Sequence, residues 1–273
     1  MYQLTCSIVL YENNPEVLKK AIESVLQSRL NIKLFLIDNS GTDQLKNLAF
    51  SNAVDYTFNN KNIGFGNAHN TALEKARANA PYHLILNPDI EFHEDVLENI
   101  YNFMEKHKDV GQLMPKVFYD NGNLQKLCHL IPAPVNLVSR RFFENYHFSK
   151  KINDRYELEG FNYNTCANIP NLSGCFMFMR NSVLEKVGGF DTRFFMYMED
   201  IDLTRRMHKV SQTLFYPEVS IYHKYEKGSY SNSKLLKHHI NSAIKYFNKW
   251  GWFFDEERSR VNNETLHRLN LPK

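Results

Sequence analysis

The sequence has few cysteines and no long hydrophobic run, and both absences restrict what the chain can be. Its 273 residues include four cysteines, none in CxxC spacing, which excludes a disulfide-stabilised scaffold and predicts reduced, mostly buried thiols. No stretch of about 18 apolar residues is present, so we expect no membrane-spanning helix. The first residues lack the pattern of a signal peptide and predict a strand, which favours a cytoplasmic protein.

A dominant charge of one sign is also missing. The net charge is +3, and the 33 Lys and Arg residues are spread along the chain without a long run. A nucleic-acid partner is therefore not expected, because such proteins carry a clustered basic stripe. Hydrophobic residues make up 43% of the chain, enough to bury a core, which excludes a disordered protein. The length fits one large domain or one domain with an appended subdomain.

The first hundred residues alternate between two hydrophobic patterns. The predicted strands are Gln3–Leu10, Ile32–Ile37, Val54–Phe58 and His83–Leu86, and the predicted helices are Glu16–Gln27, Asn67–Asn79 and His93–Lys106. This alternation predicts an α/β fold with a mostly parallel sheet flanked by helices. Ligands of such sheets bind at the carboxyl ends of the strands, where the sequence places Asp38-Asn39, the Gly64 segment and Asn87-Pro88-Asp89.

The second half of the chain has a weaker pattern. Aromatic and charged residues mix between Tyr119 and Pro170, which predicts a loop-rich insertion over the binding cleft. The elements expected after it are the strand Leu172–Met179, the helices Asn181–Val187 and Ile201–Lys209, the strands Leu214–Phe215 and Val219–Tyr222, and the amphipathic helix Ser233–Trp250.

Asn87-Pro88-Asp89 offers a carboxylate in a turn directly after a predicted strand. Mg²⁺ in proteins is typically held by one or two carboxylates together with substrate phosphates, so Asp89 is a candidate metal ligand. The same three residues are also a common turn signal, and the residues alone leave both interpretations open.

A second acidic motif, Glu199-Asp200-Ile201-Asp202, begins a predicted helix beside the aromatic stretch 194–197. Acids favour helix N-termini because the helix dipole stabilises them. Aromatic surface and neighbouring like charge would also raise the pKa of a carboxylate, as a general base working near neutrality requires. The motif is therefore compatible with a structural and with a catalytic role.

Two further motifs suggest contacts to phosphate. Glycines in the segment 62–67 precede a helix, where a phosphate can approach the backbone, although the pattern is neither GxGxxG nor a P-loop and also fits a plain turn. His223 ends a predicted strand and either fills a structural role or completes a metal site as a neutral imidazole. Lys227 and Ser229 follow it and are candidates for binding a diphosphate.

In this order the motifs resemble one family, the inverting family-2 glycosyltransferases of the GT-A (Rossmann-like) fold, and within it the bacterial rhamnosyltransferase-like and galactofuranosyltransferase-like branch. The resemblance extends from Leu4 to about Ser229. The stretches that carry it are Ser7–Tyr11, Leu36–Ser40, Asn62–Asn70, Leu84–Asp89, Ser173–Arg180 and Gly188–Asp202.

The resemblance implies roles for the matching residues. Asp200 matches the catalytic base, with Glu199 in support. Asp89 and His223 match metal ligands, whereas Asn87 stands where the family motif has its first acid. The residues expected around the nucleotide and the donor sugar are Tyr11, Glu12, Asp38, Asn39, Gly64, Asn67, Asn70, Asn87, Lys227 and Ser229. Asp202 and Gly174 are expected to support the acceptor side.

The implied activity is a metal-dependent transfer of a sugar from a nucleotide-diphosphate donor to a hydroxyl of a cell-surface glycan precursor. The donor expected from the branch is dTDP-rhamnose-like or a UDP-sugar, and the acceptor is a glycan or a lipid-linked oligosaccharide. The implied cofactor is a divalent cation, Mg²⁺ or Mn²⁺, which the ligand types do not distinguish.

Three other functions explain less of the pattern. A glycoside hydrolase using Asp89 and Asp200 would leave the nucleotide elements unexplained. A nucleotidyltransferase is expected to have a Gly-rich basic loop after its first strand, where this chain has the residues 10–14 without Gly or Lys. A nucleotide-sugar-binding pseudo-transferase or scaffold would not need Asp89, Asp200 and His223 together.

We expect a catalytic domain over residues 1–230, with 119–170 as its variable acceptor-side insertion, and a helical extension over 231–273. The predicted helix Ser233–Trp250 has an apolar face flanked by lysines. That face packs either against the catalytic domain or against a second subunit of a homodimer, or it lies on the cytoplasmic membrane surface as a peripheral contact.

Overall fold

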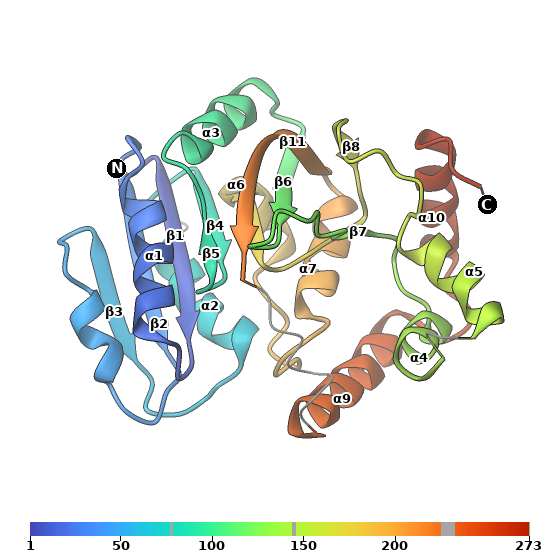
Figure 1. Cartoon of the computed structure of the whole chain (residues 1–273), viewed down its shortest axis with the longest axis horizontal. Coiled ribbons are helices and arrows are strands. Elements are labelled where there is room, and N and C mark those ends of the chain that lie inside the picture. The colour runs from blue at the N-terminus through green and yellow to red at the C-terminus, as the bar shows by residue number, and fades with distance from the viewer. Residues whose placement is uncertain (77–78, 144–145, 225–232, 273) are drawn as a thin grey trace.

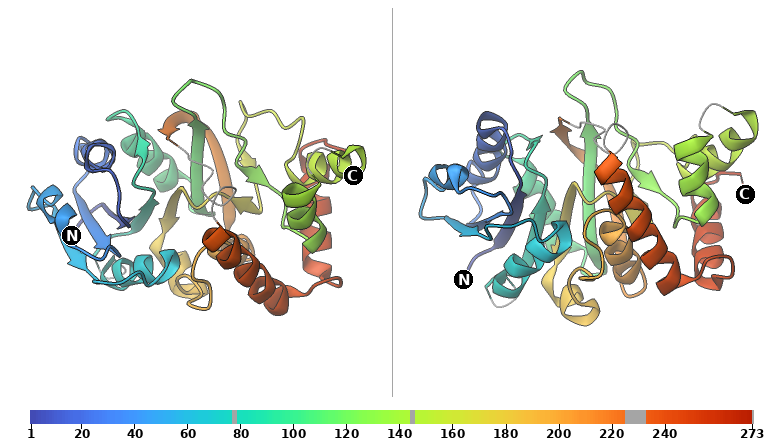
Figure 2. Two further views of the ribbon diagram at one scale, coloured as in Figure 1. Left: turned by 60° about the horizontal axis from the view of Figure 1, so that its bottom comes forward. Right: turned by 90° about the horizontal axis from the view of Figure 1, so that it is seen from below.

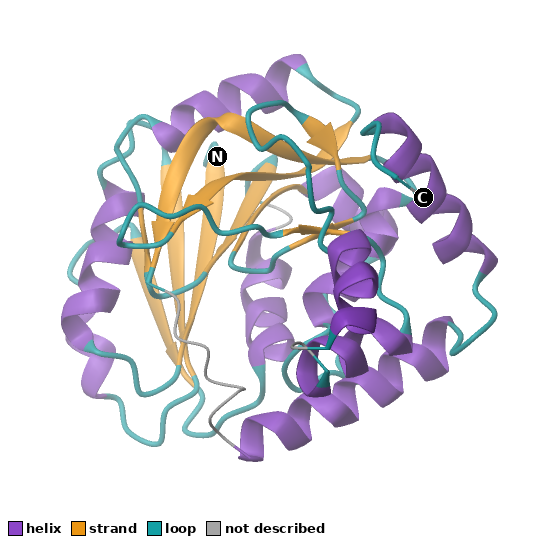
Figure 3. Ribbon diagram, turned by 45° about the vertical axis from the view of Figure 1, so that its right-hand side comes forward, coloured by secondary structure: helices purple, strands orange, loops and turns teal. Residues whose placement is uncertain are grey.

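The computed structural model describes residues 1–76, 79–143, 146–224 and 233–272 of the chain. A central sheet has the strand order β3-β2-β1-β4-β10-β6-β11-β5, with β8 paired to β11. Strands β1 to β4 pair in parallel, as do β6 and β11, whereas β10 runs antiparallel to both β4 and β6. Helices flank this sheet, as Figures 1 and 3 show.

The first half of the chain forms the βα units that the sequence predicts. The elements are β1 (Leu4–Leu10), α1 (Pro15–Leu26), β2 (Ile32–Asp38), the short 3₁₀ helix η1 (Gln44–Leu48), β3 (Val54–Phe58), α2 (Phe65–Ala76), β4 (Tyr82–Leu86), β5 (Ile90–Glu91) and α3 (Val96–Lys106). The Asn14 side chain caps α1 by accepting from the backbone N–H groups of Glu16 and Val17, and Pro15 occupies the first turn, where its missing N–H costs nothing.

The second half completes the sheet. Its elements are β6 (Val110–Phe118), β10 (Phe176–Arg180), α6 (Asn181–Val187), α7 (Glu199–His208) and β11 (Gln212–His223). The sequence did not predict β6, and it predicted two short strands where β11 is one. The pairing of β11 with β6 shifts between Tyr216 and Ser220, beside Pro217, which has no N–H to donate to the ladder.

The segment 119–170 contains more regular structure than the sequence predicts. It holds β7 (Cys128–His129), α4 (Pro134–Phe142), α5 (His147–Tyr156) and β8 (Ala167–Asn168), and β9 (Asn171–Leu172) follows. The predicted strand Leu172–Met179 is therefore two strands, β9 and β10, separated by a turn at Ser173–Cys175. Buried side chains of the segment, such as Cys128 and Tyr156, form a second hydrophobic cluster with Phe215 of β11.

Two C-terminal helices, α9 (Ser233–Trp250) and α10 (Glu256–Arg268), pack on this framework. Figure 2 shows them beside α4 and α5. Leu266 of α10 joins the second hydrophobic cluster, and the Asn262 amide exchanges hydrogen bonds of 2.9 Å with the backbone N–H and C=O of Ile131. Tyr246 and Phe247 of α9 are buried against Phe194 and Met198. One face of α9 thus packs against the rest of the chain.

Among the residues that the structure describes, no helix is both long and apolar enough to cross a bilayer.

Candidate active site

The sheet brings several of the predicted site residues to one edge. Strands β1 to β4 are parallel, and β6 and β11 run in the same direction because β10 is antiparallel to both β4 and β6. Tyr11, Asp38, Asn87 and His223, which stand at or just past the ends of β1, β2, β4 and β11, therefore lie along the carboxyl edge of the sheet, where α/β sheets bind ligands.

Asp38 and Asn39 are buried at this edge and hold its loops. The Asp38 carboxylate accepts hydrogen bonds from the Ser40 backbone N–H at 2.8 Å and from the Tyr56 hydroxyl at 2.6 Å. The Asn39 amide donates to the carbonyl of Gly64 at 3.3 Å. Tyr11, by contrast, is about half exposed, at 47%. Its neighbour Glu12 is also exposed, with a positive φ of 51°.

The glycine segment is clamped to the loop that precedes the acidic motif. Gly64 has a φ of +90°, and a Cβ there would lie 2.3 Å from the carbonyl oxygen of Phe195. The Asn70 amide donates to the carbonyl of Phe190 and accepts from its N–H, both at 2.8 Å. The Asn67 amide donates to the Ile63 carbonyl at 3.0 Å. Gly64 and Asn70 thus fix the position of residues 190–195.

Asp89 and His223 face each other across the carboxyl edge. The His223 ring is buried, and its Nε2 atom lies 3.4 Å from Asp89 Oδ1 and 3.4 Å from the Asn87 amide nitrogen. Its Nδ1 atom lies 3.1 Å from the Gln125 amide oxygen. The Gln125 NH₂ group donates to the carbonyls of His223 and Phe118, at 2.9 and 3.4 Å, which fixes the amide orientation.

Gln125 thereby selects the tautomer of the His223 ring. Its amide oxygen can only accept, so Nδ1 of His223 carries the proton and donates it. In the neutral ring, Nε2 then carries the lone pair and faces Asp89. A carboxylate and a neutral imidazole oriented by a second side chain are the donor types that suit a divalent cation. The described residues hold no group of three or more His, Cys, Asp or Glu that could bind a metal, so substrate oxygens would have to complete the coordination.

Glu199 and Asp200 begin α7 after two residues with left-handed backbone, Tyr197 and Met198, both with φ of 69°. Such conformations cost about 1–3 kcal/mol each and cluster at functional sites. Burial, followed by the charge of Asp200, raises the pKa of Glu199, and burial raises the pKa of Asp200. Glu199 Oε2 has no hydrogen-bond partner among the described residues.

Backbone donors hold both oxygens of the Asp200 carboxylate. Its two oxygens accept from the N–H groups of Gly174 and Ile201, each at 2.9 Å. A Cβ on Gly174 would lie 2.8 Å from Asp200 Cβ, so only glycine allows this approach. The next residue, Cys175, accepts from the N–H of Asn87 at 2.9 Å. Two consecutive residues therefore connect the Asp200 carboxylate to the turn that carries Asp89.

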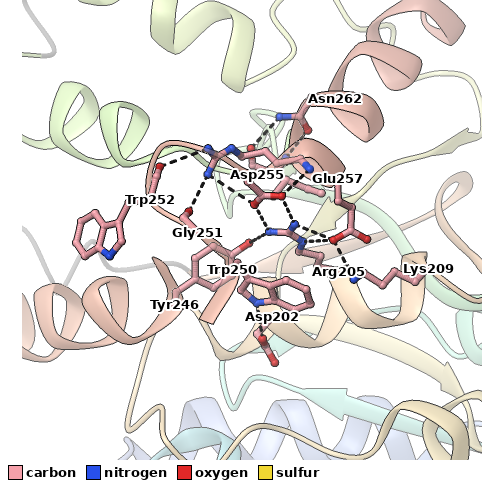
Figure 4. A network of polar contacts seen from close by, with 12 residues as sticks. Asp202, Arg205, Lys209, Tyr246, Trp250, Gly251, Trp252, Asp255, Glu257 and Asn262 are labelled. Atoms are coloured by element: carbon pink, nitrogen blue, oxygen red, sulfur yellow. Dashed lines mark hydrogen bonds and ion pairs between the residues drawn. The ribbon is translucent and has the colours of Figure 1, made fainter. Parts of the chain in front are cut away.

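Asp202 has a structural environment. It is fully buried and accepts from Arg206 at 2.9 Å and from the Trp250 ring nitrogen at 2.8 Å, with the Lys249 ammonium at 2.6 Å. Figure 4 shows the hydrogen bond from Trp250 to Asp202 beside the ion pairs of Arg205. Its contacts join α7 to α9, and its support of the acceptor side stays a prediction.

A cavity of about 560 Å³ opens next to His223 and Ser173. Its other walls come from the segment 119–170 and include Gln125, Lys126, His129, Arg140, Lys150, Asn153, Asp154 and Glu157. Sequence reasoning placed the acceptor under this segment but identified none of these side chains, because no motif marks them. Lys227 and Ser229 lie outside the described residues.

Comparison with known proteins identifies the family. Residues 6–188, about two thirds of the chain, match Glycosyl transferase family 2. The rhamnosyltransferase WbbL of Escherichia coli is 28% identical over 250 residues, 88% of this chain and 90% of that protein. The N-acetylglucosaminyl-diphospho-decaprenol L-rhamnosyltransferase of Mycobacterium tuberculosis is 22% identical over 250 residues, 86% of this chain and 81% of that protein.

The fold has a counterpart of known structure. The crystal structure of residues 1–349 of TarS from S. aureus superposes with a TM-score of 0.59 and 15% identity, over 97% of this chain and 71% of that one. At this identity the likeness shows the fold alone, and it confirms the predicted α/β fold of the GT-A type. Together with the family match, it confirms the resemblance seen in the sequence: the chain belongs to glycosyl transferase family 2 and is a glycosyltransferase.

Proposed function

We propose that the chain moves a sugar from a nucleotide-diphosphate donor to an acceptor hydroxyl by a single inverting displacement, with Asp200 as the general base. The observation that carries this proposal is the link through Gly174 and Cys175, which ties the Asp200 carboxylate to the Asp89 turn at the carboxyl edge. A base beside the anomeric carbon and a binding place for the leaving diphosphate are the two parts that the reaction needs.

The hydrogen bonds favour Asp200 over Glu199 as the charged member of the pair. Two adjacent buried carboxyls resist double ionisation, so one proton stays on the pair at neutral pH. Backbone N–H donors reach both oxygens of Asp200, whereas only one oxygen of Glu199 can be stabilised in this way, because its Oε2 has no donor among the described residues. Asp200 is thus ionised first, and Glu199 retains the proton.

In the reaction, Asp200 accepts the proton of the acceptor hydroxyl as the hydroxyl oxygen bonds to the anomeric carbon. The bond from that carbon to the diphosphate oxygen breaks on the opposite face, and its electron pair leaves with the nucleoside diphosphate. No enzyme nucleophile is required, and the configuration at the anomeric carbon inverts.

The residues at the carboxyl edge fit a divalent cation, Mg²⁺ or Mn²⁺, held by Asp89 and the Nε2 atom of His223, with Asn87 beside them. When bound, the cation neutralises charge on the diphosphate. Gln125 keeps the imidazole in the tautomer that leaves Nε2 available as a ligand.

The substrates are proposed from the relatives. Both are rhamnosyltransferases, and the name of the mycobacterial protein specifies a lipid-linked diphosphate acceptor. A dTDP-rhamnose-like or UDP-sugar donor and a lipid-linked glycan precursor are therefore the substrates we propose. Tyr11 and Glu12 are exposed where the nucleotide would bind, and the cavity beside Ser173 would receive the acceptor. Residues 1–230 would form the catalytic domain and 231–273 its extension.

The test is donor binding and turnover across a panel of nucleotide sugars, with Mn²⁺, Mg²⁺ or chelator. Asp89→Ala should weaken metal-dependent donor binding. Asp200→Asn should bind the donor normally and lose about 10²–10⁴ in kcat, the range for removal of a general base. Asp95→Asn, an exposed carboxylate at the start of α3, is the matched control and should keep full activity. Failure of every nucleotide sugar to bind would reject the proposal.

A further inference from the structure

Helices α4 and α9 leave an apolar face outside the folded core. A groove of about 180 Å³ runs between them and is lined by Leu137, Val138, Leu236, Ile240, Ile244 and Phe247. The inner face of α9 is covered, because Tyr246 packs there against the rest of the chain. Phe247 belongs to that packing and forms the floor of the groove, whereas Val138, Ile240 and Ile244 on its walls stay exposed by 42–47%.

The two most exposed aromatic side chains among the described residues lie next to the groove. The turn between α9 and α10 exposes Phe253 by 81% and Phe254 by 96%, and Trp252 at its start lines the end of the groove. Other large hydrophobic side chains exposed on these segments are Val135, Val138, Phe143, Tyr146, Ile240 and Ile244. Contiguous apolar surface of this kind marks a binding face on a protein that is otherwise polar outside.

Cations lie beside this face. Helices α4 and α9 contain no Asp or Glu and six Lys or Arg residues, of which Arg140 pairs with Glu157 and Lys249 pairs with Asp191 and Asp202 away from the groove. Lys237 lies three and seven residues before Ile240 and Ile244, so it shares their side of α9. Arg141 lines the groove itself. An apolar face bordered by cations, with tryptophan and phenylalanine at its tip, is the composition of a surface that docks on anionic lipid.

We propose that the α4–α9 face, with the Trp252–Phe254 turn, docks on an anionic lipid surface. A second copy of the chain fits less well, because a two-fold dimer would set the same cations against one another. The position relative to the cavity agrees with this partner, since Arg141 lines the groove and the preceding residue, Arg140, lines the cavity beside His223. The reason for such docking, a lipid-linked acceptor, rests on the proposed function, but the docking itself does not.

The experiment is vesicle co-sedimentation without nucleotide or acceptor, so its outcome is independent of the proposed reaction. The intact chain should bind vesicles of mixed phosphatidylglycerol and phosphatidylcholine at low salt, and should bind phosphatidylcholine alone much less. Phe253→Ser/Phe254→Ser should weaken binding at least about tenfold, because each phenylalanine loses its burial in the lipid. Lys237→Glu should weaken binding to the anionic vesicles at least about fivefold and leave the weak neutral binding unchanged.

Phe50→Ser is the matched control, since Phe50 is 55% exposed on the segment between η1 and β3, far along the chain from the groove. It should bind vesicles as the unaltered chain does. An unchanged melting temperature would show that the double variant is folded. The proposal is overturned if the intact chain stays unbound at low salt, or if the double variant binds equally well. A dimer in light scattering that the double variant abolishes would assign the face to a second copy instead.

Discussion

Replacing Asp255 with Ala tests how much the C-terminal helices stabilise α7, the helix that carries Asp200. Arg205 of α7 is 1% exposed and donates to both oxygens of Asp255, at 2.7 and 2.8 Å. Its guanidinium also lies 4.1 Å from the centre of the Trp250 ring, and Glu257 accepts from it at 2.8 Å. Figure 4 shows these contacts converging on one buried cation.

Asp255→Ala should lower the free energy of unfolding in two ways, by breaking an ion pair and by removing a helix cap. Removing one partner of a buried ion pair costs about 3–5 kcal/mol, and we expect the lower end because Glu257 remains. Asp255 also caps α10 by accepting from the Arg258 N–H at 2.9 Å, and losing such a cap costs about 1 kcal/mol. The free energy of unfolding should therefore fall by about 4 kcal/mol. With an unfolding entropy of about 2.1 cal/mol/K per residue, the Tm should fall by about 7 °C.

Thermal denaturation of a small variant set checks this reasoning. Asp255→Asn keeps an acceptor for the cap and for Arg205 and should lose less. Arg205→Met/Asp255→Ala removes the buried cation as well and should be more stable than the sum of the single changes predicts. Glu264→Ala, which breaks an exposed ion pair with Arg260, should shift the Tm by less than about 2 °C. A fall in Tm below about 2 °C for Asp255→Ala would refute the estimate.

Two further predictions concern the acidic pair. Burial and Asp200 raise the pKa of Glu199 above its unfolded value, so the folded state holds this proton more tightly, and stability is lost as pH rises through the folded pKa. Glu199→Gln should therefore match the unaltered protein in Tm at acid pH and exceed it in mildly alkaline buffer; a lower Tm in alkali would contradict this. Gly174→Ala places a Cβ 2.8 Å from that of Asp200 and should lower kcat about 10²-fold with donor affinity unchanged. Gly41→Ala, with no atom near its added Cβ, is the kinetic control, and equal kcat in the two variants would show that the base position is not critical.

The sequence predicted the elements whose hydrophobic pattern reflects their burial. The bounds of β3, α6 and α9 agree with the structure to the residue, and those of α1 and β2 to within one residue. Strand β6 escaped prediction because its apolar residues are interrupted by Gly111, Gln112, Pro115 and Lys116. Pro115 pairs with Tyr216 of β11 but has no partner on its other side, because β10 pairs only with Gln112 and Leu113.

The helices α4 and α5 were missed for a different reason. They are short and charged, and the side chains that settle their positions come from distant segments. The ring of Tyr156 stacks with His129, and the carboxylate of Glu157, just past α5, pairs with Arg140 of α4 at 2.8 Å. Such contacts leave no periodic pattern in the local sequence, which shows only a mixture of aromatic and charged residues there.

The residues of the candidate site also fall into those that a local pattern identifies and those that depend on distant contacts. Asp89, Asp200 and His223 could be singled out because acids and histidine after strands or at a helix start are visible in the sequence. Gln125 could not, since its significance depends on a contact with a ring 98 positions away. The choice of base shows the limit most clearly. Glu199 and Asp200 are adjacent acids of similar chemistry, and the sequence ranks them only by resemblance. The fold distinguishes them physically, because a glycine 26 positions earlier lets a backbone N–H reach one carboxylate, while Oε2 of the other is left without such a donor among the described residues.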